Sequence, residues 1–168
     1  MKVAAVCLVA GAVLTGCTKE GPVGPAGANG TNGNANVTNQ VFTLTTSNWG
    51  STSTNWYSNI TYPNATATAL LGSVQVYYSI NNGTSWTAMP CTVYGSVANY
   101  FFGVTTTVGN IYVTWLYNGA GIGSDPCTAF GVSSMQLNVV IIPPSHRLAN
   151  PHVNLNNYEE VKATFHLK

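Results

Sequence analysis

The segment from Gly72 to Met89 has the alternating pattern of a β-hairpin. Its first half places an apolar side chain at every second position, which is the period of a strand with one buried face. These apolar positions are Val74, Val76, Tyr78 and Ile80. Asn82-Gly83 follows, a pair that accepts positive φ in a tight turn, and Ser85-Trp86-Thr87 begins the returning strand. This segment commits the chain to antiparallel β-structure.

The same character extends from Val37 to Pro143. Runs of β-branched and aromatic residues are interrupted at short intervals by Gly, Asn and Pro, and no 3.6-residue period is sustained. Short antiparallel strands with this spacing are typical of a sandwich. We therefore predict an all-β fold, an antiparallel β-sandwich that is either immunoglobulin-like or jelly-roll-like. Further strands are expected at residues 40–46, 55–62, 97–105, 110–117 and 134–142.

The strand expected at 110–117 has large side chains on both faces. One face carries Trp115 and its alternating neighbours, and the other carries Tyr112 and Leu116. A strand that is apolar on both sides is typical of a position inside a sheet with both faces covered. We therefore expect this strand to be central and buried on both sides.

The end of the chain predicts a short C-terminal helix. Tyr158, Val161 and Phe165 recur at positions i, i+3 and i+7, which puts them on one helix face, and Asn156 or Asn157 can cap the first turn. The charged residues between them face outward. We expect the apolar stripe to pack on the sandwich or on its edge.

Charge is scarce. From Gly21 to Ser145 the only charged side chain is Asp125, and beyond the first 16 residues four basic side chains balance four acidic ones. No electrostatic field gathers phosphates, and DNA-binding motifs are absent, so this composition excludes nucleic acid as a partner.

The N-terminus has the pattern of a secretory signal. Met1-Lys2 precedes an apolar run from Val3 to Val13, and small residues follow before Cys17. A transmembrane helix is an alternative, although the run is short against the roughly 20 residues that span a bilayer. An ordinary secretory signal with an incidental Cys17 is another. We predict that residues 1–16 are a signal peptide.

The four residues Leu14-Thr15-Gly16-Cys17 resemble the lipobox of bacterial lipoproteins. The resemblance implies cleavage just before Cys17 and acylation of that residue, which would anchor the protein to a membrane. Lys19-Glu20 is similar, in shortened form, to the lysine-plus-acid signal that sends such lipoproteins to the outer face of the outer membrane. The implied location is the outer membrane, with the domain exposed on the cell surface or, alternatively, on the periplasmic face.

Residues 17–36 are interpreted as the lipidated cysteine and a linker. Glycine recurs at every third position from Gly21 to Gly33, as a collagen triple helix requires. Five triplets are few, however, so a flexible or semi-rigid stalk competes with a true collagen stalk, which would make the protein a homotrimer. Residues 37–168 are the predicted β-sandwich head with its C-terminal helix.

Two cysteines remain after the signal and Cys17, namely Cys91 and Cys127. In an exported protein an even pair is expected to be oxidised, so we predict a Cys91–Cys127 disulfide. A reactive or metal-binding thiol pair is the alternative, but neither cysteine has CxxC spacing.

The sequence contains few side chains that could act as catalytic acids, bases or nucleophiles in a recognisable arrangement. The β region holds one acid, Asp125, while Glu159 and Glu160 are neighbours on a predicted helix and point in different directions. No GxSxG motif occurs, and all three histidines follow residue 145 without a compact ligand spacing. We predict no enzyme activity, no catalytic residue, no metal site and no cofactor.

Aromatic side chains are the remaining candidates for ligand contact. Trp86 and Trp115 are expected in the core because of their places in strands. Trp49 and Trp56 lie in a Ser/Thr/Asn/Gly-rich stretch and, with Tyr57, could stack on sugar rings beside polar, uncharged partners.

Taken together, several segments resemble the small collagen-tract lipoproteins of Bacteroidota. The resemblance implies a location and an architecture and assigns no catalytic residue. We expect a lipid-anchored, non-catalytic binding or structural module with a surface glycan or a protein as ligand; an adhesive carbohydrate-binding head and a trimeric structural spike are the alternatives. The segments are the lipobox, GPVGPAG, GNANV, YYSINNGTSWTAMP, MQLNVVIIPP and NYEEVKATFHL.

Overall fold

The structure is a computed structural model that describes residues 37–95, 98–119 and 121–168. These residues belong to one compact unit, Asn32–Lys168. The predicted signal peptide, the lipidation at Cys17 and the Gly-X-Y linker lie outside the described residues.

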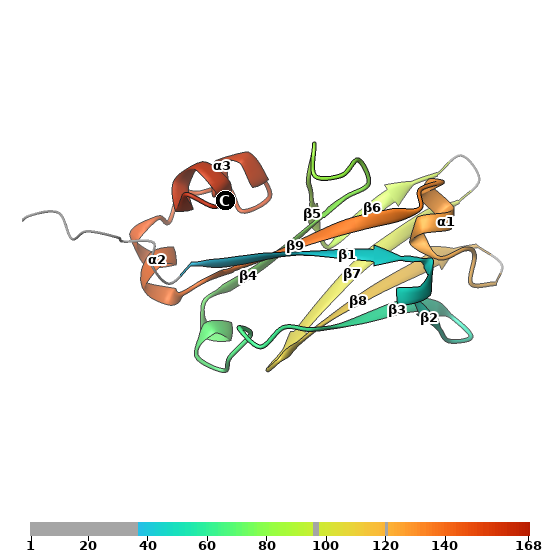
Figure 1. Cartoon of the computed structure of the whole chain (residues 1–168), viewed down its shortest axis with the longest axis horizontal. Coiled ribbons are helices and arrows are strands. Elements are labelled where there is room, and N and C mark those ends of the chain that lie inside the picture. The colour runs from blue at the N-terminus through green and yellow to red at the C-terminus, as the bar shows by residue number, and fades with distance from the viewer. Residues whose placement is uncertain (1–36, 96–97, 120) are drawn as a thin grey trace, which may run out of the picture. The chain divides into compact units, whose positions relative to one another are not determined.

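The regular secondary structure of the described chain is mainly β, in two antiparallel sheets with a few short helices (Figure 1). Sheet A has the order β1 (Thr38–Thr45), β9 (Ser134–Ile142), β4 (Ser73–Ser79), β5 (Thr87–Met89). Sheet B has the order β2 (Gly50–Ser51), β3 (Asn55–Thr61), β8 (Asn110–Asn118), β7 (Asn99–Thr107), β6 (Cys91–Tyr94). The helices are η1 (Thr46–Asn48), η2 (Ala69–Leu71), α1 (Pro126–Phe130), α2 (Pro144–Ala149) and α3 (Tyr158–Phe165).

The predicted strands match β1, β3, β4, β7, β8 and β9 to within a few residues. The hairpin from β4 to β5 is confirmed, with positive φ at both Asn82 and Gly83. Its loop is longer than expected, because only three residue pairs form, from Val76–Met89 to Tyr78–Thr87. The short strands β2 and β6 and the helices α1 and α2 were not predicted.

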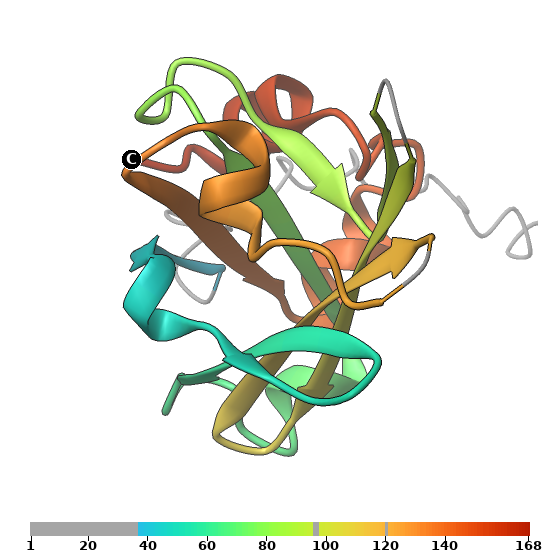
Figure 2. The same cartoon turned by 90° about the vertical axis from the view of Figure 1, so that its right-hand side faces the viewer.

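A first hydrophobic core contains side chains from both sheets. Trp115 of β8 is fully buried at its centre, with the ring of Phe102 at 4.8 Å in a T-shaped arrangement and the ring of Tyr100 stacked at 4.4 Å. Helix α1 begins at a capping residue, Asp125, whose carboxylate accepts from the amide of Thr128 at 3.2 Å. Figure 2 looks at the end of the molecule where α1 lies.

Helix α3 builds a second core on the other face of sheet A (Figure 1). Its predicted stripe, Tyr158, Val161 and Phe165, is buried against Tyr77 and the side chains of β9. The Tyr77 hydroxyl donates to the carbonyl of Leu155 at 2.6 Å. The predicted cap is also confirmed, because the Asn157 side chain accepts from the amide of Glu160 at 3.3 Å.

The strand that is buried on both faces is β9, and this corrects the expectation for residues 110–117. Strand β8 does lie at the centre of sheet B. Its outward side chains Tyr112 and Leu116, however, are 38% and 39% exposed, because none of the helices in the described part of the chain covers this face. Trp86, expected in a strand, lies in the hairpin loop. Its ring is half-buried and packs on Tyr158, with the two ring centroids 5.4 Å apart.

Tyr77→Phe tests how α3 is attached. We expect a loss of about 1–2 kcal/mol in the free energy of unfolding at pH 7, because the partly buried carbonyl of Leu155 loses its donor. Burial, and secondly the nearby Tyr158, raise the pKa of Tyr77. A raised pKa stabilises the fold fully below about pH 10, the ordinary tyrosine value, and this contribution is lost as the pH rises further.

The variant should therefore show a smaller alkaline loss of stability than the parent. Urea unfolding at pH 7 and above pH 10 measures both effects. Tyr112→Phe, at the exposed face of sheet B, is the control and should change stability by less than about 0.5 kcal/mol. Equal stability of Tyr77→Phe and the parent at both pH values would contradict this account.

Candidate functional site

The outer face of sheet B is the candidate site. Side chains alternate along a strand, so in β8 Val113 and Trp115 enter the first core while Tyr112 and Leu116 point outward. In β7 the same alternation buries Phe102 and turns Phe101 outward. The outward side chains are exposed, since none of the described helices packs on them.

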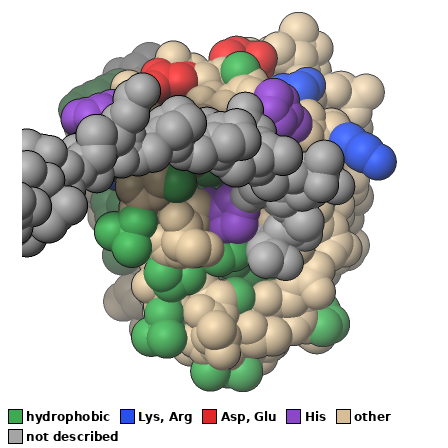
Figure 3. Space-filling model, turned by 90° about the vertical axis from the view of Figure 1, so that its left-hand side faces the viewer, with side chains coloured by type: hydrophobic (Ala, Val, Ile, Leu, Met, Phe, Trp, Pro, Cys, Tyr) green, Lys and Arg blue, Asp and Glu red, His purple; other side chains and the backbone are tan. Residues whose placement is uncertain are grey.

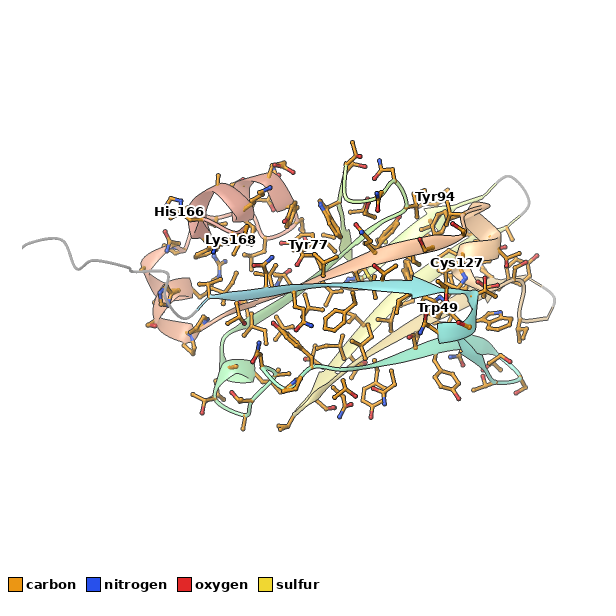
Figure 4. All side chains as sticks on the ribbon, viewed as in Figure 1. Trp49, Tyr77, Tyr94, Cys127, His166 and Lys168 are labelled. Carbon is orange, nitrogen blue, oxygen red and sulfur yellow. The ribbon has the colours of Figure 1, made fainter. Side chains whose placement is uncertain are left out.

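Strand register makes these outward positions one continuous surface. Phe101 is paired with Leu116, and the next outward residue of β8, Thr114, is paired with Tyr57 of β3. Tyr112 comes next along β8. In edge strand β6, Cys91 and Val93 pack against the core while Tyr94 is 81% exposed. Figure 4 labels Tyr94.

Exposed aromatic side chains of the described residues occur on this surface alone. Aliphatic side chains are exposed elsewhere, for example Leu71 and Leu148, but the aromatic ones are gathered on sheet B. We call this surface the aromatic face. It consists of Tyr57, Tyr94, Phe101 and Tyr112, together with Leu116.

Two glycines let aromatic rings lie against the sheet. A Cβ atom built on Gly50 would come within 2.8 Å of the Tyr57 ring, and one on Gly103 within 3.1 Å of the Phe101 ring. Both rings therefore occupy space that a side chain at the glycine would fill. They lie along the sheet surface instead of projecting from it.

The polar side chains between these rings are uncharged. None of the five strands of sheet B contains Asp, Glu, Lys, Arg or His. The surface can therefore offer aromatic packing and hydrogen bonds from amides and hydroxyls. The outward polar residues are Asn55, Asn59, Thr61, Thr92, Asn99, Thr105, Thr107, Asn110, Thr114 and Asn118.

Of the three predicted ligand-contacting residues, only Tyr57 is on the aromatic face. Trp49 is 6% exposed inside the first core, with its ring 6.1 Å from that of Phe102, so it cannot reach a ligand. Trp56 is half-buried, and its indole N–H donates to the carbonyl of Gly123 at 3.3 Å. The polar loop composition suggested exposure, but the indole rings fill the core beside it.

The predicted Cys91–Cys127 disulfide is not present, because both residues are free thiols. The Cys127 thiol is fully buried and contacts the carbonyl of Leu44 at 3.5 Å (Figure 4). Burial first, and Asp125 second, raise the pKa of Cys127. Burial also raises the pKa of Cys91. The two thiols belong to different parts of the core, one on α1 and the other on β6.

Two of the acidic side chains, Asp125 and Glu160, accept hydrogen bonds from nearby groups of the chain. Asp125 is buried, and both its carboxylate oxygens accept from Thr128. Glu160 accepts from the amide of Asn154 at 2.9 Å. Figure 4 shows Cys127, two residues from Asp125, at the opposite end of the molecule from His166. Within the described residues, no three His, Cys, Asp or Glu side chains are grouped so that they could hold a metal ion.

Charge is collected at one end of the described chain. Apart from Asp125, its acidic and basic side chains all fall within residues 147–168. Figure 3 views the molecule from the side where α2 and α3 lie in Figure 1, and it shows acidic, basic and histidine side chains there. The aromatic face is therefore separate in sequence from the charged segment.

A shallow hollow of about 460 Å³ lies between residues 80–82 and 132–136. Its lining is uncharged, and the side chains of Gln136 and Asn82 are already hydrogen-bonded to each other at 3.2 Å. The hollow offers no acid, base or aromatic ring to a ligand.

Sequence reasoning missed most of the aromatic face, although signals for it were present. The adjacent pair Phe101-Phe102 cannot bury both rings on one side of a strand, so one had to face outward. The sequence also places Tyr112 and Leu116 on one face of their strand, but large side chains on both faces favour the prediction that this face is covered.

Comparison of the chain with family models, with curated proteins and with solved structures gives no match. The candidate site therefore rests on the geometry of this chain.

Thiol labelling tests the state of the cysteines. In the unit Asn32–Lys168 without reductant, we expect slow reaction with iodoacetamide at pH 8, since burial disfavours both thiolates. After unfolding in urea, still without reductant, mass spectrometry should find Cys91 and Cys127 both labelled. Unfolded protein that takes up label only after reduction would show a disulfide and contradict the free-thiol geometry.

Proposed function

We propose that this protein is a non-catalytic binding module, tethered to the outer membrane through acylated Cys17 and exposed on the cell surface. The observation that supports binding is the aromatic face: large exposed side chains gathered on an uncharged sheet surface are typical of interaction sites. Because no family model, curated protein or solved structure matches the chain, the binding function is inferred from this surface alone.

The proposed architecture is a β-sandwich head, immunoglobulin-like or jelly-roll-like, carried on a short collagen-like linker. Two antiparallel sheets with a shared core support the sandwich. Among the described residues, no helix is both long and apolar enough to cross a bilayer. The homotrimer that a collagen-like stalk would form stays a prediction.

Acylation is tested by labelled palmitate in cells that express the full chain. We expect label in the parent and none in Cys17→Ala, because the cysteine sulfur carries a diacylglyceryl group through a thioether in the lipoproteins that this signal resembles. Cys7→Ala is the matched control, since Cys7 lies in the predicted signal peptide, and it should keep the label. Label in Cys17→Ala would contradict the anchor.

Location is tested separately by protease treatment of intact cells. Loss of the folded head from intact cells is expected for surface exposure. Protection until the outer membrane is opened would instead place the head on the periplasmic face.

A further inference from the structure

We propose that the aromatic face binds an extended, uncharged polysaccharide laid across the strands of sheet B. This ligand class rests on the proposed binding function and makes it specific. The surface is defined by Tyr57, Tyr94, Phe101, Tyr112 and Leu116.

The chemistry of the surface matches that of a sugar chain. One side of a pyranose ring presents C–H groups, which pack on the electron-rich face of an aromatic ring, and its hydroxyls need donors and acceptors at the rim. Tyr57 and Tyr112 supply rings on adjacent strands. Asn59 lies opposite Tyr112 in β3, and Thr105 lies opposite it in β7. Each ring therefore has uncharged hydrogen-bonding groups beside it.

The glycines set the orientation of two rings. Because Tyr57 lies over Gly50 and Phe101 over Gly103, these rings are low against the sheet. Broad contact with a flat ligand requires such rings, whereas a small molecule is usually held in a concave pocket. The surface therefore favours a ligand that is itself long and flat.

The rings are spread across four strands. Tyr57 is on β3 and Tyr94 on β6, with β8 and β7 between them. Three strand spacings amount to about 14 Å, so a monosaccharide can cover one ring only. A chain of several sugar units is needed to contact the whole aromatic face.

The lack of charged side chains in sheet B favours an uncharged ligand over charged ones. Sheet B strands provide no cation for a nucleic acid or an acidic glycan and no anion for a basic peptide. Protein interfaces, in addition, favour Arg and aromatic anchors seated in pockets. The strands of sheet B contain no Arg, and the rings of Tyr57 and Phe101 lie on the sheet surface instead of in a pocket.

The test is affinity electrophoresis of the unit Asn32–Lys168, which contains both hydrophobic cores and should fold without the preceding residues. Gels contain β-1,4-glucan, galactomannan or xylan as neutral probes and alginate as an acidic one. We expect retardation by at least one neutral polysaccharide and none by alginate. Retardation should change little with added salt, because no ion pair is involved.

Variants locate the binding surface. Tyr57→Ala and Phe101→Ala should each weaken binding about five- to tenfold, since each removes one stacking ring. Tyr57→Phe keeps the ring and should bind nearly as the parent. Gly50→Ala keeps Tyr57 but displaces its ring, so it should also weaken binding. Leu148→Ala, exposed on α2, is the control and should have no effect.

Ligand length gives an independent readout. Hexasaccharides of the retained polymer should bind at least tenfold more tightly than disaccharides, because the rings are spread over about 14 Å. Circular dichroism and thermal unfolding of each variant show that lost binding is not lost folding.

Two results would overturn the proposal. Binding that Tyr57→Ala and Phe101→Ala leave unchanged would move the ligand off the aromatic face. Retardation by none of the neutral polysaccharides would reject the ligand class. Because this unit lacks Cys17, neither result depends on the lipid anchor, which palmitate labelling and protease treatment test separately.

Discussion

Strand β9 is buried on both of its faces, and this double burial determines how the C-terminal segment and the two hydrophobic cores are arranged. Leu137 and Val139 face the first core, between the sheets, while Val140 and Ile142 face the second core under α3. Leaving each outer side chain in water would cost about 1.5–3 kcal/mol. The C-terminal segment must therefore fold back over sheet A, and the Tyr77 hydroxyl bond to it helps to fix its place.

Sheet B, in contrast, is buried on its inner face only. Its inner side chains complete the first core, but its outer face carries aromatic rings that no described element covers. Such a surface is costly in water unless it is small, dispersed among polar groups or used for binding. Here Asn and Thr side chains separate the rings, and the rings over Gly50 and Gly103 lie against the sheet. The same arrangement forms the surface that we propose binds an uncharged ligand.

Sequence patterns predicted the strands and α3 well, because alternation and the helical stripe record which side of an element is apolar. They could not tell which apolar face is covered: Tyr77 and Tyr112 look alike along the chain, yet only the first meets a helix. A disulfide also depends on the distance and direction of two Cβ atoms, which the spacing of Cys91 and Cys127 does not reveal. Trp49 was misplaced for a similar reason, since a polar segment can still bury one large ring.

The two sheets differ in one respect: strand β9 of sheet A is covered on both sides, while sheet B has one open, aromatic face. Hydroxyl-radical footprinting with mass spectrometry of the folded unit Asn32–Lys168 tests it residue by residue. We predict rapid oxidation of the aromatic face and protection of the second core until the protein unfolds. Protection of Phe101 and Tyr112 to the same degree as Tyr77 and Tyr158 would contradict it.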